Sequence, residues 1–146
     1  MKRNIFKIKV MNRYGILTIL FAVAICAATS CQDYPTDDNG LLITERSECY
    51  VSSFGLYGVD YQNVLTTTVN LTNGIDTTAC TINAVVFFGT DLKNLYPQFA
   101  LITDAKLEPK IIGLTDFSSG SRQWTVVSGN RKVRKTYTVN LTVQTP

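Results

Sequence analysis

The sequence predicts an all-β fold, an immunoglobulin-like β-sandwich of about seven strands in residues 45–146. From about Leu42 onward, short runs that alternate in polarity or are rich in β-branched residues recur about every 10 to 15 residues. Turn residues separate these runs, most clearly at Asn73-Gly74 and Gly129-Asn130. About seven short strands within about 100 residues are what such a sandwich requires. A chain of 146 residues, 45% hydrophobic and 17% charged, is typical of one globular domain.

The expected strands cover residues 48–56, 64–71, 80–88, 98–103, 106–112, 122–128 and 133–143. The last one shows the clearest alternation: Tyr137, Val139, Leu141 and Val143 share one parity, and hydroxyl or amide residues share the other. On the preceding strand Trp124 has the parity of Val126. We therefore expect Trp124 to lie in the core against the apolar face of the last strand.

Residues 1–30 have the three parts of a secretory signal, namely a cationic start, an apolar stretch from Tyr14 to Ala28, and small residues at its end. The apolar stretch of about 15 residues is shorter than the ~20 that a membrane-spanning helix needs, so we expect cleavage. Ala28-Thr29-Ser30-Cys31 resembles a bacterial lipobox, which predicts that Cys31 carries acyl chains such as palmitate. An ordinary signal peptide with a chance cysteine is the second interpretation, and Met11 is an alternative start.

Residues 31–44 are polar, acidic and interrupted by proline and glycine, which predicts a flexible tether between the lipid and the domain. The acidic run behind Cys31 resembles the surface-export signal of Bacteroides-type lipoproteins, although a plain solvated linker is the alternative. We expect a lipid-anchored protein of the bacterial outer membrane that faces the cell surface, with the periplasmic face as the second possibility.

Catalytic and nucleic-acid functions find little support in the sequence. Histidine is absent, which removes the residue most used for general acid-base work and metal ligation, so we expect no enzyme activity, metal or cofactor. Five of the fourteen basic residues precede Tyr14, and all eleven acidic residues follow Ser30. Residues 31–146 have nine basic and eleven acidic residues, which gives a net charge of about −2. This negative charge argues against a nucleic-acid partner.

A resemblance covers roughly Glu48 to Val143. The residues that carry it are Thr90-Asp91-Leu92-Lys93-Asn94-Leu95-Tyr96-Pro97, Leu107-Glu108-Pro109, Thr115-Asp116-Phe117-Ser118, Trp124-Thr125-Val126-Val127-Ser128-Gly129 and Lys135-Thr136-Tyr137-Thr138-Val139. This succession is similar to the immunoglobulin-like modules of Bacteroides surface lipoproteins, most of all to domain-of-unknown-function family 5018 and its relatives. The resemblance implies a module that often precedes a larger carbohydrate-related domain, and it implies no catalytic residues.

The candidate ligand contacts are aromatic and basic side chains in expected loops. Tyr57, Tyr61 and Tyr96 lie near loops and are candidates for exposed aromatic faces, although partial burial is the commoner fate of such residues. Arg131 and Lys132 belong to a basic run at the tip of the last hairpin, which is either a charged contact or a solvated turn that protects a strand edge. We expect a glycan or surface-protein partner, with an adhesin or assembly subunit that pairs edge strands, or a structural spacer, as alternatives.

Two cysteines remain in the expected mature chain, Cys49 and Cys80. An oxidising compartment permits a disulfide between them, but the alternation of the strands places Cys49 outward and Cys80 inward, so the bridge stays open as a possibility. Asp76-Thr77-Thr78 resembles the O-glycosylation motif of the same bacterial group, which makes Thr77 a possible glycosylation site.

Overall fold

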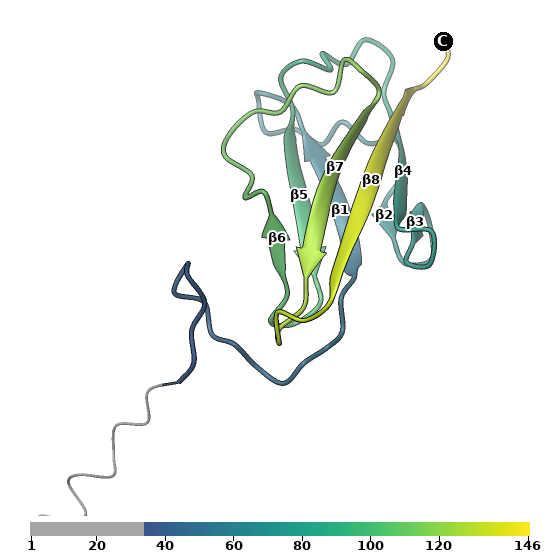
Figure 1. Cartoon of the computed structure of the whole chain (residues 1–146). Helices are drawn as coiled ribbons and strands as arrows, with labels where there is room; N and C mark the ends of the chain where they lie inside the picture. The colour runs from purple at the N-terminus through teal and green to yellow at the C-terminus, as the bar shows by residue number, and fades with distance from the viewer. Residues whose placement is uncertain (1–33) are drawn as a thin grey trace, which may run out of the picture. The chain divides into compact units, whose positions relative to one another are not determined.

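A computed structural model of the chain describes residues 34–146 (Figure 1). The expected signal peptide, the lipidation site Cys31 and the alternative start Met11 lie outside the described residues. The chain divides into two units, and the second, Pro35–Pro146, contains the folded domain described below. Residues 34–146 contain no helix long and apolar enough to cross a membrane.

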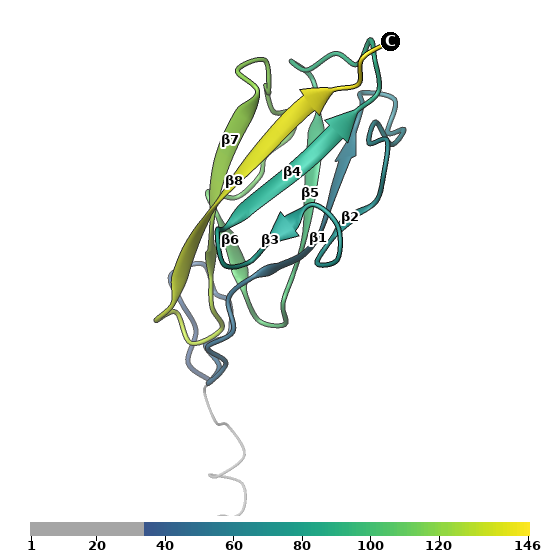
Figure 2. The same ribbon diagram turned by 90° about the vertical axis from the view of Figure 1, so that its right-hand side faces the viewer.

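The domain is a β-sandwich, as the sequence predicts. One sheet has three strands in the order β2-β1-β5, and the other has five in the order β3-β4-β8-β7-β6 (Figures 1 and 2). The strands are β1 (Val51–Tyr57), β2 (Val69–Asn70), β3 (Ile75–Asp76), β4 (Thr81–Val86), β5 (Tyr96–Leu101), β6 (Lys106–Glu108), β7 (Ser121–Val127) and β8 (Arg134–Val143).

The hairpin of β7 and β8 builds the centre of the core. Tyr137, Val139 and Leu141 are buried, as their shared parity predicts, while Val143 is partly exposed at the end of the strand. Trp124 lies opposite Tyr137 in the register of the two strands and is only 6% exposed, which confirms its expected place in the core. Its ring contacts Phe99 and Phe117, with ring centroids 5.1 and 5.8 Å away.

Strand β4 pairs with β8 in parallel, with Ile82 opposite Val139 and Ala84 opposite Leu141. Figure 2 shows the two arrows side by side and pointing the same way. The inward side chains of β4 are Ile82, Ala84 and Val86, so the predicted alternation of this strand is confirmed. Because the strands are parallel, the end of β4 lies beside the end of β8, at the end of the sandwich opposite the β7–β8 turn.

The segment 64–71, expected to form one strand, instead crosses between the two sheets. The Val64 amide donates to the Leu56 carbonyl in one sheet, and the Thr66 amide donates to the Val85 carbonyl at the end of β4 in the other. Only Val69–Asn70 forms a strand, paired with β1. A segment that bonds to both sheets in succession cannot keep the alternating register of a single strand.

Cys49 and Cys80 are both free cysteines in the structure, so it does not contain the possible disulfide. The prediction that Cys49 points outward was also wrong: a bulge between Val51 and Ser53 shifts the register, and Cys49 is buried. Its Sγ lies 3.1 Å from the Val126 carbonyl, to which it donates. Cys80 lies at the turn before β4 with φ of 54°, and its Sγ is directed to the Thr77 carbonyl of its own turn.

The described part of the expected tether is attached to the sandwich. The compact unit begins at Pro35, ahead of the boundary expected at residue 45. The Asp37 carboxylate accepts hydrogen bonds from Lys106 Nζ at 2.8 Å and from Arg131 Nε at 3.0 Å, and the Thr44 amide donates to the Gly129 carbonyl. The acidic composition that predicts a solvated linker therefore supplies, through Asp37, the group that binds this segment to the domain.

Candidate functional site

The three candidate tyrosines come together at one end of the three-stranded sheet. Tyr57 ends β1 and lies directly opposite Tyr96, the first residue of β5. Their neighbours Leu56 and Pro97 point into the core and are buried. Because side chains alternate along a strand, Tyr57 and Tyr96 both project from the outer face of the sheet.

A tight loop brings Tyr61 to the same place. The Gly58 amide donates to the Gln62 carbonyl, and the Tyr61 amide donates back to the Gly58 carbonyl. Asp60 supports this loop by accepting a hydrogen bond from the Gln62 amide. Tyr61 adopts the left-handed conformation, with φ of 59°, and its ring stacks on Tyr96 with centroids 5.0 Å apart and planes 11° apart.

The resulting surface, Tyr57, Tyr61 and Tyr96, is called here the tyrosine cluster. Tyr61 is 69% exposed, while Tyr57 and Tyr96 are half-buried. The neighbouring Tyr61 hydroxyl, together with burial, raises the pKa of Tyr96 above its usual value of 10.0, so the Tyr96 hydroxyl stays protonated. The cluster therefore offers exposed aromatic carbon and neutral hydroxyl groups, a combination that suits ligands with one apolar and one polar side.

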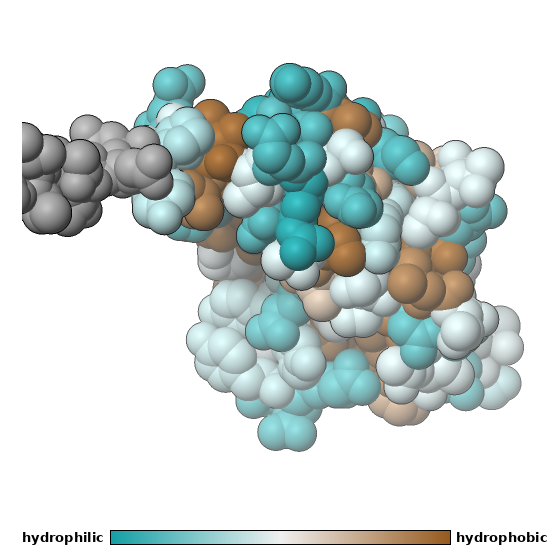
Figure 3. All heavy atoms as spheres, turned by 90° about the horizontal axis from the view of Figure 1, so that it is seen from below, coloured by the Kyte–Doolittle hydropathy of each residue, from teal (hydrophilic) through white to brown (hydrophobic). Residues whose placement is uncertain are grey.

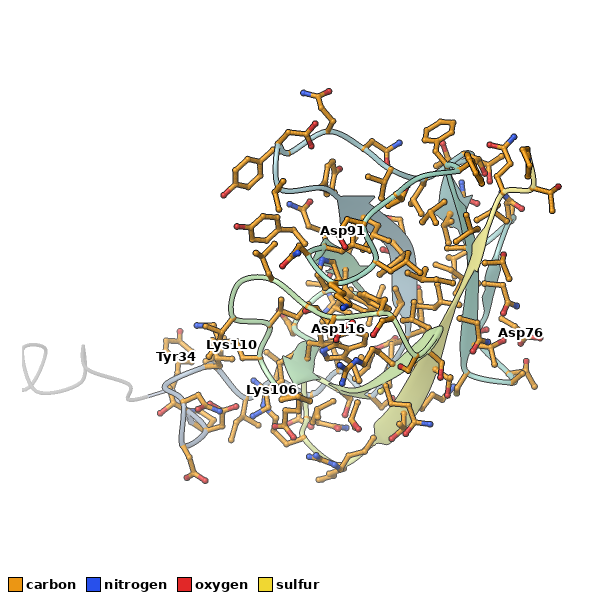
Figure 4. All side chains as sticks on the ribbon, turned by 90° about the horizontal axis from the view of Figure 1, so that it is seen from above. Tyr34, Asp76, Asp91, Lys106, Lys110 and Asp116 are labelled. Atoms are coloured by element: carbon orange, nitrogen blue, oxygen red, sulfur yellow. The ribbon has the colours of Figure 1, made fainter. Side chains whose placement is uncertain are left out.

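A small cavity of about 250 Å³ lies beside the cluster, between the loop after β1 and the loop before β5. Its polar lining includes Asp60, Asp91 and Asn94. Figure 4 shows Asp91 over this end of the sandwich, near Asp116 of the neighbouring loop. The Asn94 amide donates to Asp91 at 2.8 Å and, with the Lys93 backbone amide, holds the pKa of Asp91 below its usual value. Asp91 thus organises its loop as a charged carboxylate.

Arg131 and Lys132 lie at the opposite end, on the turn between β7 and β8, so they do not join the tyrosine cluster. Arg131 is bound internally: besides Asp37, its guanidinium donates to the carbonyls of Leu42, Asp104 and Ser128. Lys132 is exposed. Seen from below, hydrophilic side chains cover much of this end with apolar patches between them (Figure 3).

A wider groove of about 770 Å³ lies between residues 39–41 and the segment from β6 to Ile111. Lys106 lines it, but its ammonium is held by Asp37 at 2.8 Å and by Glu108 at 3.0 Å. Glu108 is bonded in turn to Arg134. The two charged groups of β6 that line the groove thus each have a partner within the protein. We therefore interpret the groove as a result of how the N-terminal segment packs on the domain.

The structure also places the possible glycosylation site. Thr77 lies on the turn between β3 and β4, where the Asp76 carboxylate accepts from the amides of Thr78 and Ala79, and its glycosylation stays a prediction. Figure 4 shows Asp76 at the edge of the sandwich, away from Asp91. Within residues 34–146, no three His, Cys, Asp or Glu side chains are placed to hold a metal ion.

The domain is thus a small β-sandwich module with an aromatic surface at one end. The family model described as "SGBP, N-terminal" matches residues 63–141, more than half of the sequence. The chain therefore belongs to this family of N-terminal modules of surface glycan-binding proteins. Tyr96 lies inside the matched region, whereas Tyr57 and Tyr61 precede it.

Several solved structures from Bacteroides are similar to the chain. One, from Bacteroides thetaiotaomicron and described provisionally as a glycoside hydrolase, is 32% identical over 68% of this chain with a TM-score of 0.53. A DUF4623 family protein from Bacteroides eggerthii is 15% identical over 68% (TM-score 0.47), and a Bacteroides fragilis protein described provisionally as secreted is 17% identical over 69% (TM-score 0.42). The chain covers 26%, 22% and 98% of these three proteins respectively. No match was found among curated proteins.

Proposed function

We propose that this domain is a non-catalytic module of a cell-surface protein and that it contacts glycans through the tyrosine cluster. The observation that carries the proposal is the convergence of Tyr57, Tyr61 and Tyr96 on one outer surface, with the Tyr61 ring mostly exposed. The C–H faces of sugar rings pack on aromatic rings, and sugar hydroxyls bond to the phenol groups. Membership of a surface glycan-binding family supports the same ligand class.

A binding role is favoured over hydrolysis by the state of the carboxylates. A glycosidase needs one carboxylic acid with a raised pKa to protonate the leaving group. Two carboxylates at the tyrosine end, Asp91 and Asp116, have lowered pKa values: Asn94 and Lys93 stabilise the charge on Asp91, and the Ser118 backbone amide stabilises it on Asp116. Both groups are therefore poor proton donors near neutral pH. The activity in the description of the Bacteroides thetaiotaomicron protein is not assigned to this chain, because the chain corresponds to only 26% of that protein.

The proposed setting is the outer membrane, with acyl chains on Cys31 and the domain facing the cell surface. The sequence Ala28-Thr29-Ser30-Cys31 motivates this proposal, as does membership of a surface-protein family. Cys31→Ala should abolish incorporation of labelled palmitate and leave an unprocessed precursor. Normal labelling of that variant would contradict the lipid anchor. The resemblance to domain family 5018 stays a prediction beside the family match.

A spacer role is the second candidate, because the Asp37 ion pairs attach the N-terminal segment to the sandwich and would transmit a fixed orientation.

The adhesin alternative has weaker support. Strand β5 is a sheet edge, but Leu95 is already paired with Thr115, and Pro97 has no N–H to offer. Leu56 lies opposite Pro97, and its carbonyl accepts a hydrogen bond from the Val64 amide on the side away from β5. The two residues therefore form a pair without hydrogen bonds between them, and the nitrogen of Pro97 faces the unpaired edge of β5. This edge is poorly suited to bind another strand.

A glycan array probed with the domain 35–146 tests the proposal. We expect binding that is lost when Tyr57, Tyr61 and Tyr96 are all replaced with serine, while the melting temperature stays within a few degrees. Lys132→Ser, at the opposite end and exposed, is the matched control and should bind like the parent. A triple variant that keeps full binding, or a parent domain that binds no glycan, would contradict the proposed function and leave the spacer role.

A further inference from the structure

The outer face of the three-stranded sheet continues from the tyrosine cluster into a shallow groove of about 280 Å³. Its outward-facing lining comes from β1, β5 and the segment before β2, and consists of Ser53, Gly55, Tyr57, Thr68, Gln98 and Ala100. Gly55 lies opposite Gln98, and Ser53 lies opposite Ala100, so three of these four facing residues are small. Tyr57 belongs both to this groove and to the tyrosine cluster, which makes the two surfaces continuous.

Gly55 allows the Tyr57 ring to lie over the sheet. A Cβ built at Gly55 would lie 3.1 Å from Cε2 and 3.4 Å from the hydroxyl oxygen of Tyr57. The Cε2, Cζ and hydroxyl atoms of the ring therefore lie close above the glycine. A residue larger than glycine at this position would displace the ring, so Gly55 allows the Tyr57 side chain to lie at the end of the groove.

The polar groups of the groove are neutral, and they are not used by the fold. Within residues 34–146, the side chains of Ser53, Thr68 and Gln98 make no hydrogen bond to another protein group, whereas neighbouring Ser52 is bonded to the Ala100 carbonyl. Hydroxyl and amide groups can both donate and accept, as recognition of sugar hydroxyls requires. All six outward-facing residues are uncharged, so the groove has no cation to bind an acidic sugar.

The direction of the groove indicates the shape of the ligand. It runs along β1 from Tyr57 to Ser53, which at 3.4 Å per residue is roughly 14 Å, longer than one sugar ring. From these observations we infer that the groove binds a neutral, linear oligosaccharide, with one sugar on the tyrosine cluster and the following sugars beyond the Tyr57 ring, toward Gln98 and Ser53. This inference rests on the proposed function and adds the ligand's charge, its shape and its direction on the sheet.

Calorimetric titration of the domain 35–146 with neutral and acidic oligosaccharides tests the inference. The probes are the disaccharide and hexasaccharide of the malto, cello and xylo series, with hexagalacturonate as the acidic ligand. We expect one neutral hexasaccharide to bind at least fivefold more tightly than its disaccharide, and hexagalacturonate to bind more weakly than both. Equal affinity for the two lengths, or preferred binding of hexagalacturonate, would overturn the inference and leave the proposed function standing.

Variants then separate the groove from the cluster. Gln98→Ala should weaken hexasaccharide binding about five- to tenfold and leave disaccharide binding unchanged, because it removes contacts beyond the first sugar. Gly55→Val should instead weaken binding of both lengths, because its side chain would displace the Tyr57 ring of the cluster, with the melting temperature as a check on folding. Gln123→Ala, on the outer face of the other sheet, is the matched control and should bind like the parent.

The outcomes distinguish the two proposals. Tyr61→Ser should reduce binding of both lengths, because Tyr61 belongs only to the cluster. A folded Gln98→Ala variant that binds the hexasaccharide as tightly as the parent would overturn the groove assignment. If no oligosaccharide binds the parent domain, the proposed function fails and the groove assignment fails with it.

Discussion

The ring of Tyr61 lies parallel to the ring of Tyr96, with centroids 5.0 Å apart, although the two residues come from different segments of the sequence. Stacking holds the more exposed ring, Tyr61, in one orientation. Because the positive φ of Tyr61 is imposed by the hydrogen-bonded loop 58–62, the loop and the stack together fix the surface available to a ligand.

The two contributions of Tyr61, its ring and its hydroxyl, can be separated. Tyr61→Phe keeps the stacked ring and removes the hydroxyl that raises the pKa of Tyr96, so we expect that pKa to fall toward 10.0 while glycan binding is reduced only slightly. Tyr61→Ser removes both and should lower the pKa and the binding together. Ultraviolet titration of the tyrosines and calorimetry measure the two effects. An unchanged Tyr96 pKa in Tyr61→Phe would show that the hydroxyls do not interact.

Loss of the Trp124 side chain should strongly destabilise the domain. This side chain is nearly fully buried between Phe99 and Phe117, and Trp124→Ala should cost about 3 to 5 kcal/mol of unfolding free energy. That loss approaches the whole stability of a small domain. Urea denaturation monitored by circular dichroism measures it. The control Ile112→Ala removes an apolar side chain that is 87% exposed and should change stability by less than about 0.5 kcal/mol. Equal effects of the two changes would contradict the core assignment.

Asp37 should control whether the N-terminal segment stays attached. Its hydrogen bond with Lys106, helped by the backbone amides of Leu41 and Asn39, holds the pKa of Asp37 well below its usual value of 3.8. A lowered carboxyl pKa stabilises the folded form at pH values above 3.8, and this contribution is lost only as the pH falls through the lowered value. The segment should therefore remain attached from pH 7 down to about 4.

Hydrogen exchange of residues 35–44, followed by mass spectrometry, checks this prediction. Asp37→Asn should raise the exchange of these amides at pH 7 and leave the exchange of β7 and β8 unchanged. Asp38→Asn, at the exposed neighbouring residue, is the control and should exchange like the parent. Equal protection in both variants would mean that the ion pairs with Lys106 and Arg131 do not hold the segment.

Tyr137 is completely buried, and its hydroxyl has no hydrogen-bond partner among the described residues, although it lies toward the Val51 backbone. Burial raises the pKa of Tyr137 from 10.0 to about 12. Since ionisation is easier in the unfolded chain, stability should be constant below pH 10 and fall between about pH 10 and 12. Tyr137→Phe should remove this alkaline loss and be neutral or slightly stabilising at pH 7. A destabilisation above about 1 kcal/mol at pH 7 would reveal a hydrogen bond from the hydroxyl.

The sequence was most informative where the pattern is local. Tyr137, Val139 and Leu141 alternate along one strand, so their burial follows from their spacing alone. Cys49 was predicted to point outward, because a single sequence does not reveal the bulge between Val51 and Ser53. The parallel pairing of β4 with β8 depends on contacts between distant segments and was also not predictable from periodicity.

The candidate site shows the same limit. Chemistry alone selects Tyr57, Tyr61 and Tyr96 as candidates, but their meeting depends on the register of β1 with β5 and on the loop 58–62. Arg131 was grouped with them because it lies in a basic turn. In the structure Arg131 binds the Asp37 carboxylate. This contact depends on where the N-terminal segment packs, which no local sequence pattern indicates. The groove beside Gly55 was missed, because it depends on the register that places Gly55 opposite Gln98 and Ser53 opposite Ala100.

NMR mapping of the ligand-contact surface tests most directly whether the tyrosine cluster binds glycans. Neutral oligosaccharides, including the maltose, cellobiose and xylose series, are titrated into the isotope-labelled domain 35–146, and the shifts of its backbone amides are followed. We expect the largest changes at residues 57–61 and 96–98, with the β7–β8 turn at residues 128–133 unaffected. The absence of changes with any of these sugars, or the largest changes at residues 128–133, would contradict the assignment of the tyrosine cluster as the glycan-contact surface.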